Sequence, residues 1–372
     1  MTTTRASYTD AETRMTRARA QRLGVNRSRD PVEVVRDLVG VQAQDMPSAR
    51  LALRPRTIGV TAADVRKCHD EDRTLVRIWA MRGTLHMVAA EDVGWLVGLL
   101  GPVFAAADQR RRDQLGLDDD LLDKAMPAVR GILGRHGPLT RADLVERLDA
   151  HRVRLDLKTQ GPAHLVGYAA MTGLVCRGPD VEKGEPTYVL VEDWIGKQRT
   201  LEGDGALAEL TRRYVASRGP VTPDDFKRWT GLPARQARHG FALVAEQLTE
   251  VETVSGTAFV LKGTTRRRPR REPAVELVGM FDEYLLGYAN RDLVLDPRFA
   301  KRIQTGGFVK PAVLLDGRVV GTWSQKRTAG KVTITVEPFE DLTEVGPRLA
   351  GVVRDVGRFL ETNSELRMGE PQ

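Results

Sequence analysis

The chain has 372 residues, of which 41% are apolar and 29% are charged, and its mean hydropathy is −0.32. These values are typical of a soluble globular protein, and the length predicts about two to four structural units rather than one core. Lysine and arginine outnumber aspartate and glutamate by 57 to 50, which gives a net charge of +7. This excess permits a nucleic-acid partner without requiring one, so the position of the basic residues matters more than their number.

The cysteines, the histidines and the N-terminus exclude several kinds of site. Cys68 and Cys176 lie far apart, so we expect no disulfide framework and no CxxC pair, as in the reducing cytosol. The six histidines show no HExxH or Cys-His spacing, and we expect no metal site. Residues 1–10 lack the apolar core of a signal peptide, and the apolar run at 93–107 contains glycines and Pro102 and is too short to cross a bilayer. We therefore expect a cytoplasmic protein that does not contact a membrane.

The N-terminal part predicts three helices followed by a hairpin, which is the element order of a winged helix. Thr9 caps the first helix, and Asp30 before a proline starts the second. A capping-box pattern with aspartate in place of glutamate opens the third helix. The predicted elements are helices at 11–23, from 31 into the stretch at 41–44, and from 62 towards Cys68, with strands at 75–80 and 84–89.

The second helix leads into Val41-Gln42-Ala43-Gln44-Asp45, where Met46-Pro47 interrupts it. Residues two apart do not share a face of a regular helix. The amides of Gln42 and Gln44 therefore converge on one cavity only if the helix end is distorted. Taken alone, this stretch is more simply interpreted as a solvated helix end.

The order of helices followed by two strands recurs twice more along the chain. Gly137-Pro138-Leu139-Thr140 and Gly219-Pro220-Val221-Thr222 open the short helix in both copies, about 80 residues apart. That offset suits duplicated small domains better than a solenoid. The predicted helices are 121–136, 141–148, 161–173, 207–217, 223–230 and 233–247, and the strands are 174–176, 187–191, 251–254 and 257–261.

The C-terminal part mixes strands with one helix. Asp316-Gly317 is a strong hairpin signal, the loop at 324–328 has a basic tip, and an arginine-rich linker covers 264–273. Strands are predicted at 275–280, 312–315, 318–323 and 331–336, and a helix at 342–360. The predicted fold is α+β: winged-helix units at 1–118, 119–200 and 201–263, then a mixed α/β segment with a β-hairpin at 264–372.

Common catalytic signatures are missing from the sequence. We find no GxxxxGK[ST] phosphate loop, no strand-linked GxGxxG fingerprint and no GxSxG elbow. Nothing requires a cofactor, and we expect none. By fold alone, a basic protein of repeated winged helices would be interpreted as a DNA-binding regulator.

Four sequence blocks resemble the AlkZ branch of the AlkZ/YcaQ DNA glycosylases, and together they extend over nearly the whole chain. They are the Gln-Ala-Gln motif at 41–44 with Pro47 and residues 50–53, then residues 77–86, 281–288 and 315–323. The YcaQ branch has an acidic residue in place of the second glutamine, where this chain has Gln44.

The resemblance implies tandem winged helices around a concave DNA-binding face and removal of alkylated purines by N-glycosidic hydrolysis. It also implies unhooking of interstrand crosslinks made by a natural product such as azinomycin B, as self-resistance. The expected partner is double-stranded DNA that carries alkylated purines or crosslinks, which would place the protein at the nucleoid when bound. No heptad seam predicts a coiled-coil dimer, and we expect a monomer.

A pair of amides suits this chemistry. Glutamine does not titrate near neutral pH and is not a conventional general base. An N7-alkylated guanine, however, is already a cationic leaving group and departs without protonation. Gln42 and Gln44 together would orient the attacking water and present dipoles to the oxocarbenium-like sugar.

The remaining candidates have two interpretations each. Asp45 either activates water or ends a helix, Arg82 and His86 are either catalytic or structural, and Asp282 either lines the cavity or organises a turn. The DNA-binding candidates are Arg318, Gln325, Lys326 and Arg327 at the hairpin, with Arg267 and Arg268 in the linker. Each of these contacts DNA or is a solvated surface residue.

Two other functions compete with a glycosylase: a sequence-specific transcription regulator, and a DNA-damage binder without catalysis. A regulator usually carries one winged helix and an effector or dimerisation domain, which fits three such units poorly. A bifunctional lyase is disfavoured because no lysine stands out as a Schiff-base nucleophile.

Overall fold

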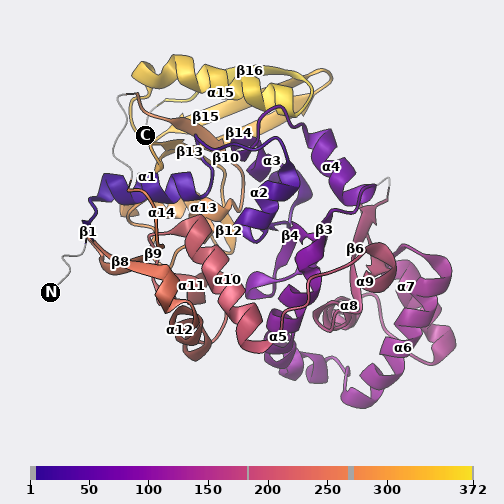
Figure 1. The fold of residues 1–372 in the computed structure, drawn as a ribbon. Helices are drawn as coiled ribbons and strands as arrows, with labels where there is room; N and C mark the ends of the chain where they lie inside the picture. Colours follow the sequence, from indigo (N-terminus) through magenta and orange to yellow (C-terminus); the bar gives the residue numbers. More distant parts are fainter. Residues whose placement is uncertain (1–5, 182–183, 267–271, 371–372) are drawn as a thin grey trace. The chain divides into compact units, whose positions relative to one another are not determined.

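The computed structural model describes residues 6–181, 184–266 and 272–370, and the chain divides into two compact units. The first comprises Met1–Arg66 and Ala208–Gln372, and the second comprises Lys67–Leu207 (Figure 1). Each unit contains both helices and strands, so the predicted mixed class is confirmed. Of the four segments expected from the sequence, 1–118 and 201–263 each cross a boundary between these units, and the four-segment division stays a prediction.

The first helices begin at the predicted caps. Thr9 Oγ1 accepts the Glu12 N–H at 3.2 Å, and Glu12 Oε2 accepts the Thr9 N–H at 3.0 Å, which completes a capping box. Asp30 caps the next helix through the Val32 N–H at 2.8 Å. The helices of the first unit are α1 (Asp10–Ala20), α2 (Pro31–Leu38), α3 (Met46–Leu53), α11 (Pro223–Thr230), α12 (Ala234–Leu243), α13 (Glu283–Leu286), α14 (Ala300–Ile303) and α15 (Gly346–Phe359), while α4 (Ala62–Asp70) and α10 (Gly203–Arg218) each cross a unit boundary.

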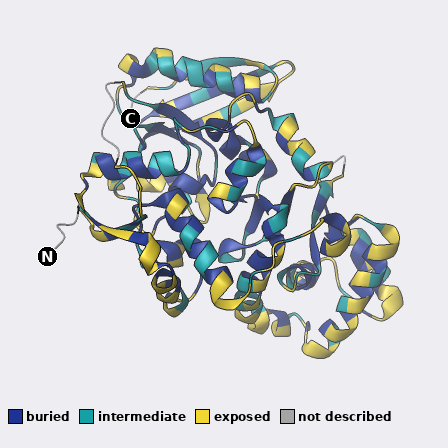
Figure 2. Cartoon of the chain, in the orientation of Figure 1, coloured by how far each residue is buried: buried dark blue, intermediate teal, exposed yellow. Residues whose placement is uncertain are grey.

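A five-stranded sheet organises the C-terminal part of the first unit. Its strands, in spatial order, are β10 (Val275–Val278), β13 (Ala312–Leu315), β14 (Arg318–Thr328), β15 (Lys331–Pro338) and β16 (Asn363–Met368). Helix α15 lies along this sheet, in which β10 is buried along its length whereas β16 has no buried residue (Figure 2). The turn between β13 and β14 places Asp316 and Gly317 at φ 46° and 75°, as a type I′ hairpin requires.

One expectation about this sheet is wrong. Residues 324–328 are not a loop, because β14 continues through them and pairs with β15 from Gly321↔Pro338 to Thr328↔Lys331. Because the pairing of β14 with β15 continues to Thr328 and Lys331, the turn between the two strands lies at Ala329-Gly330.

The first unit also contains the sheet β1 (Ala6–Ser7), β8 (Leu248–Thr253) and β9 (Gly256–Leu261), the hairpin β11 (Gln304–Thr305) and β12 (Phe308–Val309), and the short β2 (Val41–Gln42).

The second unit is built on strands in the order β4-β3-β6-β7-β5. The predicted hairpin is confirmed, since β3 and β4 pair antiparallel from Leu75↔Ala89 to Trp79↔Leu85. The strands are β3 (Leu75–Trp79), β4 (Leu85–Ala89), β5 (Leu139–Thr140), β6 (Val175–Asp180) and β7 (Pro186–Leu190), and the helices are α5 (Val93–Gln114), α6 (Asp119–His136), α7 (Arg141–Leu148), α8 (Gly161–Met171) and α9 (Val191–Trp194).

The apolar run at 93–107 is part of a long helix that the sequence did not predict. The run itself is short, but the helix that contains it, Ala90–Gln114, is long and apolar enough to cross a membrane by length and composition only. The core helix of a soluble protein meets the same criteria. A Cβ at Gly101 would lie 2.0 Å from the Met171 carbonyl oxygen, so this glycine permits the close packing of α5 on α8.

The two internal repeats have matching local structures. Thr140 caps α7 through the Asp143 N–H at 3.2 Å, and Thr222 caps α11 through the Asp225 N–H at 3.1 Å. In both copies the residues before the short helix pair with a later strand, β5 with β7 and Val221 with Phe259 of β9. Both repeats therefore have the element order of a winged helix, consistent with the predicted units.

Candidate active site and DNA-contact residues

The glutamine stretch is extended rather than helical. Helix α2 ends at Leu38, and Val39 (φ 63°) and Gly40 (φ 127°) turn the chain into β2. Met46 and Pro47 open α3 instead of interrupting a helix, since proline is well tolerated in a first helical turn. The expectation of a helix running into the glutamines is therefore wrong, because the left-handed pair at 39–40 ends it earlier.

The extended backbone allows the side chains of Gln42 and Gln44 to act together, which a regular helix would not. Gln42 lies in β2 and Gln44 in the bend that follows, so helical periodicity does not separate the two side chains. Gln42 is 8% exposed, whereas Gln44 is an exposed residue. One amide is therefore held inside the protein and the other reaches the surface.

Asp45 has a structural partner. Its Oδ2 accepts the Ser48 N–H at 2.9 Å, which makes Asp45 the N-cap of α3. Of its two interpretations, the helix-end role is the one for which the structure shows a contact.

A buried carboxylate contacts the backbone of the glutamine motif. Glu283 Oε1 accepts the Gln42 N–H at 3.1 Å. The other carboxylate oxygen, Oε2, accepts from Arg218 Nη2 at 2.7 Å and from Trp229 Nε1 at 2.9 Å. Glu283, Arg218 and Trp229 are not among the site residues expected from the sequence. The signal for Glu283 was its place next to Asp282, in an acidic pair within the block at 281–288.

Asp282 lies in the interior beside this carboxylate. Arg56 donates to both of its oxygens, at 2.8 and 2.7 Å, and both side chains are fully buried. Asp282 Oδ1 also accepts the Tyr284 N–H at 2.9 Å and caps α13. These contacts are those of a residue that organises the turn.

Arg82 and His86 belong to the second unit. Arg82 has the left-handed φ of 58° in the turn between β3 and β4. His86 is fully buried on β4, with Nδ1 3.0 Å from the Thr84 carbonyl oxygen. Their catalytic roles stay predictions.

The DNA-binding candidates differ in their availability. Arg318 donates to both oxygens of Glu340, at 2.8 and 2.6 Å, which occupies its guanidinium. Lys326 and Arg327 are exposed near the end of β14, next to the half-buried Gln325. Arg267 and Arg268 lie outside the described residues. Lys326 and Arg327 are thus the candidates with the greatest access to a phosphate backbone.

No group of three or more histidine, cysteine, aspartate or glutamate side chains is arranged to hold a metal ion in residues 6–181, 184–266 and 272–370. The candidate site residues Gln42 and Gln44 stay a prediction; the structure shows that the Gln42 N–H is bound by Glu283, which is paired with Arg218.

Residues 35–362 match the family described as "DNA glycosylase AlkZ-like". The chain belongs to this family. As an AlkZ-like glycosylase it is an enzyme that hydrolyses N-glycosyl bonds in DNA.

A sequence match and a structural match, both to Streptomyces sahachiroi, support the assignment to the AlkZ-like family. The chain is 30% identical over 321 residues to the "Interstrand DNA cross-link repair glycosylase" of Streptomyces sahachiroi, covering 83% of this chain and 85% of the relative. Its structure is similar to that of Streptomyces sahachiroi DNA glycosylase AlkZ, with a TM-score of 0.79 and 26% identity over 98% of this chain and all of the other.

Proposed function

We propose that this AlkZ-like glycosylase hydrolyses the N-glycosidic bond of N7-alkylated purines and unhooks DNA interstrand crosslinks. It would act as a monofunctional enzyme and give self-resistance to a DNA-alkylating natural product such as azinomycin B. The observation that carries the proposal is the extended segment with Gln42 anchored inside the protein and Gln44 at the surface. The relative from Streptomyces sahachiroi, named as a crosslink repair glycosylase, supports the choice of lesion.

The chemistry of two amides limits the substrate. Neither Gln42 nor Gln44 delivers a proton to a leaving group near neutral pH. A neutral purine needs such a proton, whereas a base alkylated at N7 already carries the positive charge that makes it leave. The amide oxygens then act on the sugar, where they orient water and stabilise the oxocarbenium-like centre.

The different exposure of the two glutamines suits this division of work. The hydrogen bond to Glu283 fixes the backbone from which the Gln42 side chain extends. Electrostatic stabilisation of a transition state requires groups that are held in position in this way. Gln44 is exposed, where both water and the lesion have access. We assign the two roles to the pair jointly.

Double-stranded DNA is the proposed partner, and the end of the β14–β15 hairpin is the proposed contact. Lys326 and Arg327 pair across the ladder with Thr333 and Val332, so the two cations are held on a regular strand. Adjacent strand residues point to opposite faces, so Lys326 and Arg327 extend from the two sides of the strand. Exposed cations suit phosphate binding, which carries no sequence information by itself.

Comparison of a cationic lesion with a neutral one tests this function. Duplex DNA that contains N7-methylguanine should release the free base and leave an abasic site, with no strand cleavage by a lyase step. A duplex with a neutral purine lesion, such as hypoxanthine, at the same position should release at least about 100-fold less. Tight binding to one undamaged sequence without base release would instead support the transcription regulator.

A further inference from the structure

A fully buried ion pair contacts the backbone of the glutamine motif. Arg218 Nη2 and Glu283 Oε2 are 2.7 Å apart, and their side chains are 0% and 1% exposed. The desolvation of two buried charges offsets much of their attraction, so such a pair by itself is weak evidence for a role in stability. Its partners indicate what else it does.

The ion pair holds both ends of the segment that turns α2 into the glutamine motif. Arg218 Nη1 donates to the Leu38 carbonyl oxygen at 3.0 Å, at the end of α2. Glu283 accepts the Gln42 N–H at 3.1 Å, at the other end of the turn. The chain from Leu38 to Gln42 is thus bracketed by one pair of side chains.

This turn contains a strained residue. Val39 has φ 63° and ψ 12°, a left-handed conformation that a β-branched residue rarely adopts. Strain of this kind is unfavourable and persists only where the surrounding structure fixes the backbone in place. The two hydrogen bonds to the ion pair supply such a constraint on either side of Val39.

The Glu283 carboxylate is itself held by two donors on the side away from Gln42. Trp229 Nε1 donates to Glu283 Oε2 at 2.9 Å, and the Arg218 guanidinium lies 4.2 Å from the centre of the Trp229 ring. That ring stacks on Tyr214, with centroids 5.1 Å apart. Two donors therefore fix Oε2, while Oε1 accepts from the backbone of Gln42.

We propose that Glu283, supported by Arg218 and Trp229, is a positioning residue that sets the backbone of Gln42 for base excision. The inference rests on the proposed catalytic role of Gln42. A misplacement of about 1 Å at a reacting group costs up to roughly 100-fold in rate, so the loss of this anchor reduces the chemical step more than DNA binding.

Glu283→Gln tests the proposal, and Glu276→Gln is the matched control. Glu276 is also a buried glutamate of the first unit, it pairs with Arg27 at 2.7 Å, and the structure shows no bond from it to residues 38–44. Both variants lose one buried negative charge by the same isosteric change. The amide of Glu283→Gln has a single acceptor oxygen, which cannot accept from Gln42 on one side and from Arg218 and Trp229 on the other. Single-turnover base release from N7-methylguanine DNA is measured at saturating enzyme, together with the Kd for the same DNA and the melting temperature.

We expect the rate constant of Glu283→Gln to fall by at least about 10-fold, while its Kd stays within about twofold of wild type. Glu276→Gln should keep the wild-type rate constant even if its melting temperature falls. Equal losses of rate in the two variants, or a wild-type rate in Glu283→Gln, would overturn the proposal.

Trp229→Phe provides a milder second variant. It keeps an aromatic ring against Tyr214 and removes the N–H that holds Glu283 Oε2. We expect its single-turnover rate constant to fall about threefold or more with unchanged Kd. If Glu283→Gln does not fold, this variant tests whether Glu283 positions Gln42, and an unchanged rate constant in folded Trp229→Phe would then contradict the proposal. If the wild-type protein releases no base, the proposed substrate fails; if the wild type is active and Gln42→Ala is equally active, the role of Gln42 fails instead.

Discussion

At Asp45 the structure separates two roles that the sequence leaves open. A carboxylate that activates water must be charged, whereas a cap of α3 needs only an oxygen that accepts the Ser48 N–H. Asparagine supplies that oxygen and alanine does not. The two substitutions therefore distinguish the roles.

We expect Asp45→Asn to keep base release within about twofold of wild type and to retain its stability. Asp45→Ala should lower the free energy of unfolding by about 1 kcal/mol, which is the usual effect of losing an N-cap. Urea denaturation and single-turnover base release measure the two effects. A loss of about 100-fold in Asp45→Asn would make Asp45 the catalytic carboxylate instead.

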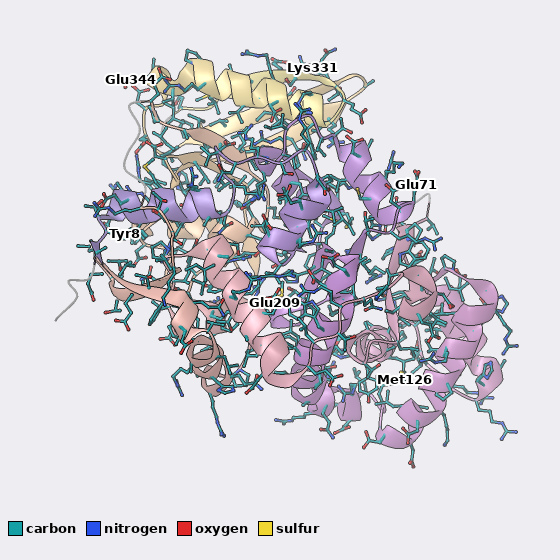
Figure 3. All side chains as sticks on the ribbon, in the orientation of Figure 1. Tyr8, Glu71, Met126, Glu209, Lys331 and Glu344 are labelled. Carbon is teal, nitrogen blue, oxygen red and sulfur yellow. The ribbon has the colours of Figure 1, made fainter. Side chains whose placement is uncertain are left out.

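Glu209 on α10 links stability to pH (Figure 3). Burial by itself raises the pKa of Glu209, but hydrogen bonds and charges from Arg212 and Arg213, with N···O distances of 3.0 and 2.8 Å, outweigh it and lower the pKa from 4.5 to about 2. Because the folded pKa lies below the unfolded one, the carboxylate stabilises the fold fully above pH 4.5. This stabilisation is lost as the pH falls through about 2.

Glu209→Gln should therefore lower the free energy of unfolding at pH 7 by about 1 kcal/mol, a value reduced by solvent screening of the partly exposed pair. The difference from wild type should shrink as the pH falls from 4.5 towards 2. Urea denaturation of both proteins across this range measures it. A difference that does not change with pH would show that Glu209 acts through packing rather than charge.

At the scale of elements, the β14–β15 hairpin is a regular strand pair with a basic end, and this affects how it binds DNA. Lys326→Ala with Arg327→Ala should weaken binding to every DNA sequence by a similar factor. It should also reduce the slope of log Kd against log salt by about 2, because each cation that contacts a phosphate releases close to one counterion. Titrations at several salt concentrations measure this slope.

Arg318 provides the control for the hairpin variants. It lies at the opposite end of β14 and its guanidinium is bound by Glu340, so Arg318→Ala should leave the salt dependence nearly unchanged. If Arg318→Ala flattens the salt dependence as much as the double variant, the DNA contact lies at the other end of the strand.

Local signals predicted the elements well. The caps at Thr9, Thr140 and Thr222 and the Asp316-Gly317 turn were all predicted from a few neighbouring residues, because each depends on hydrogen bonds or φ angles within one turn. Helix α5 was missed because its glycines suggest a break, whereas Gly101 serves a close approach to Met171.

The anchor of the glutamine motif was not predictable from local sequence. Gln42 and Glu283 are separated by 241 positions, and the hydrogen bond between them exists only in the fold. The left-handed Val39 was equally hidden, since a valine gives no local reason for a positive φ. The Gln-Ala-Gln motif itself was recognised through its resemblance to a family, whereas the residues that hold it required the structure.

At the scale of the whole molecule, the winged-helix order by itself would suit a transcription regulator as well as an enzyme. The match of residues 35–362 to the AlkZ-like family decides between them in favour of a glycosylase. The substrate remains the part that we propose: a cationic alkylated purine, alone or within an interstrand crosslink.

The most direct test of this account is single-turnover release of N7-methylguanine from duplex DNA by the wild type, Gln42→Ala and Gln44→Ala, with DNA affinity measured alongside. We predict rapid release by the wild type and a loss of about 100-fold or more in each variant, with Kd for the DNA nearly unchanged. The same order of activity should hold for an interstrand crosslink. Full base release by both glutamine variants would contradict the account.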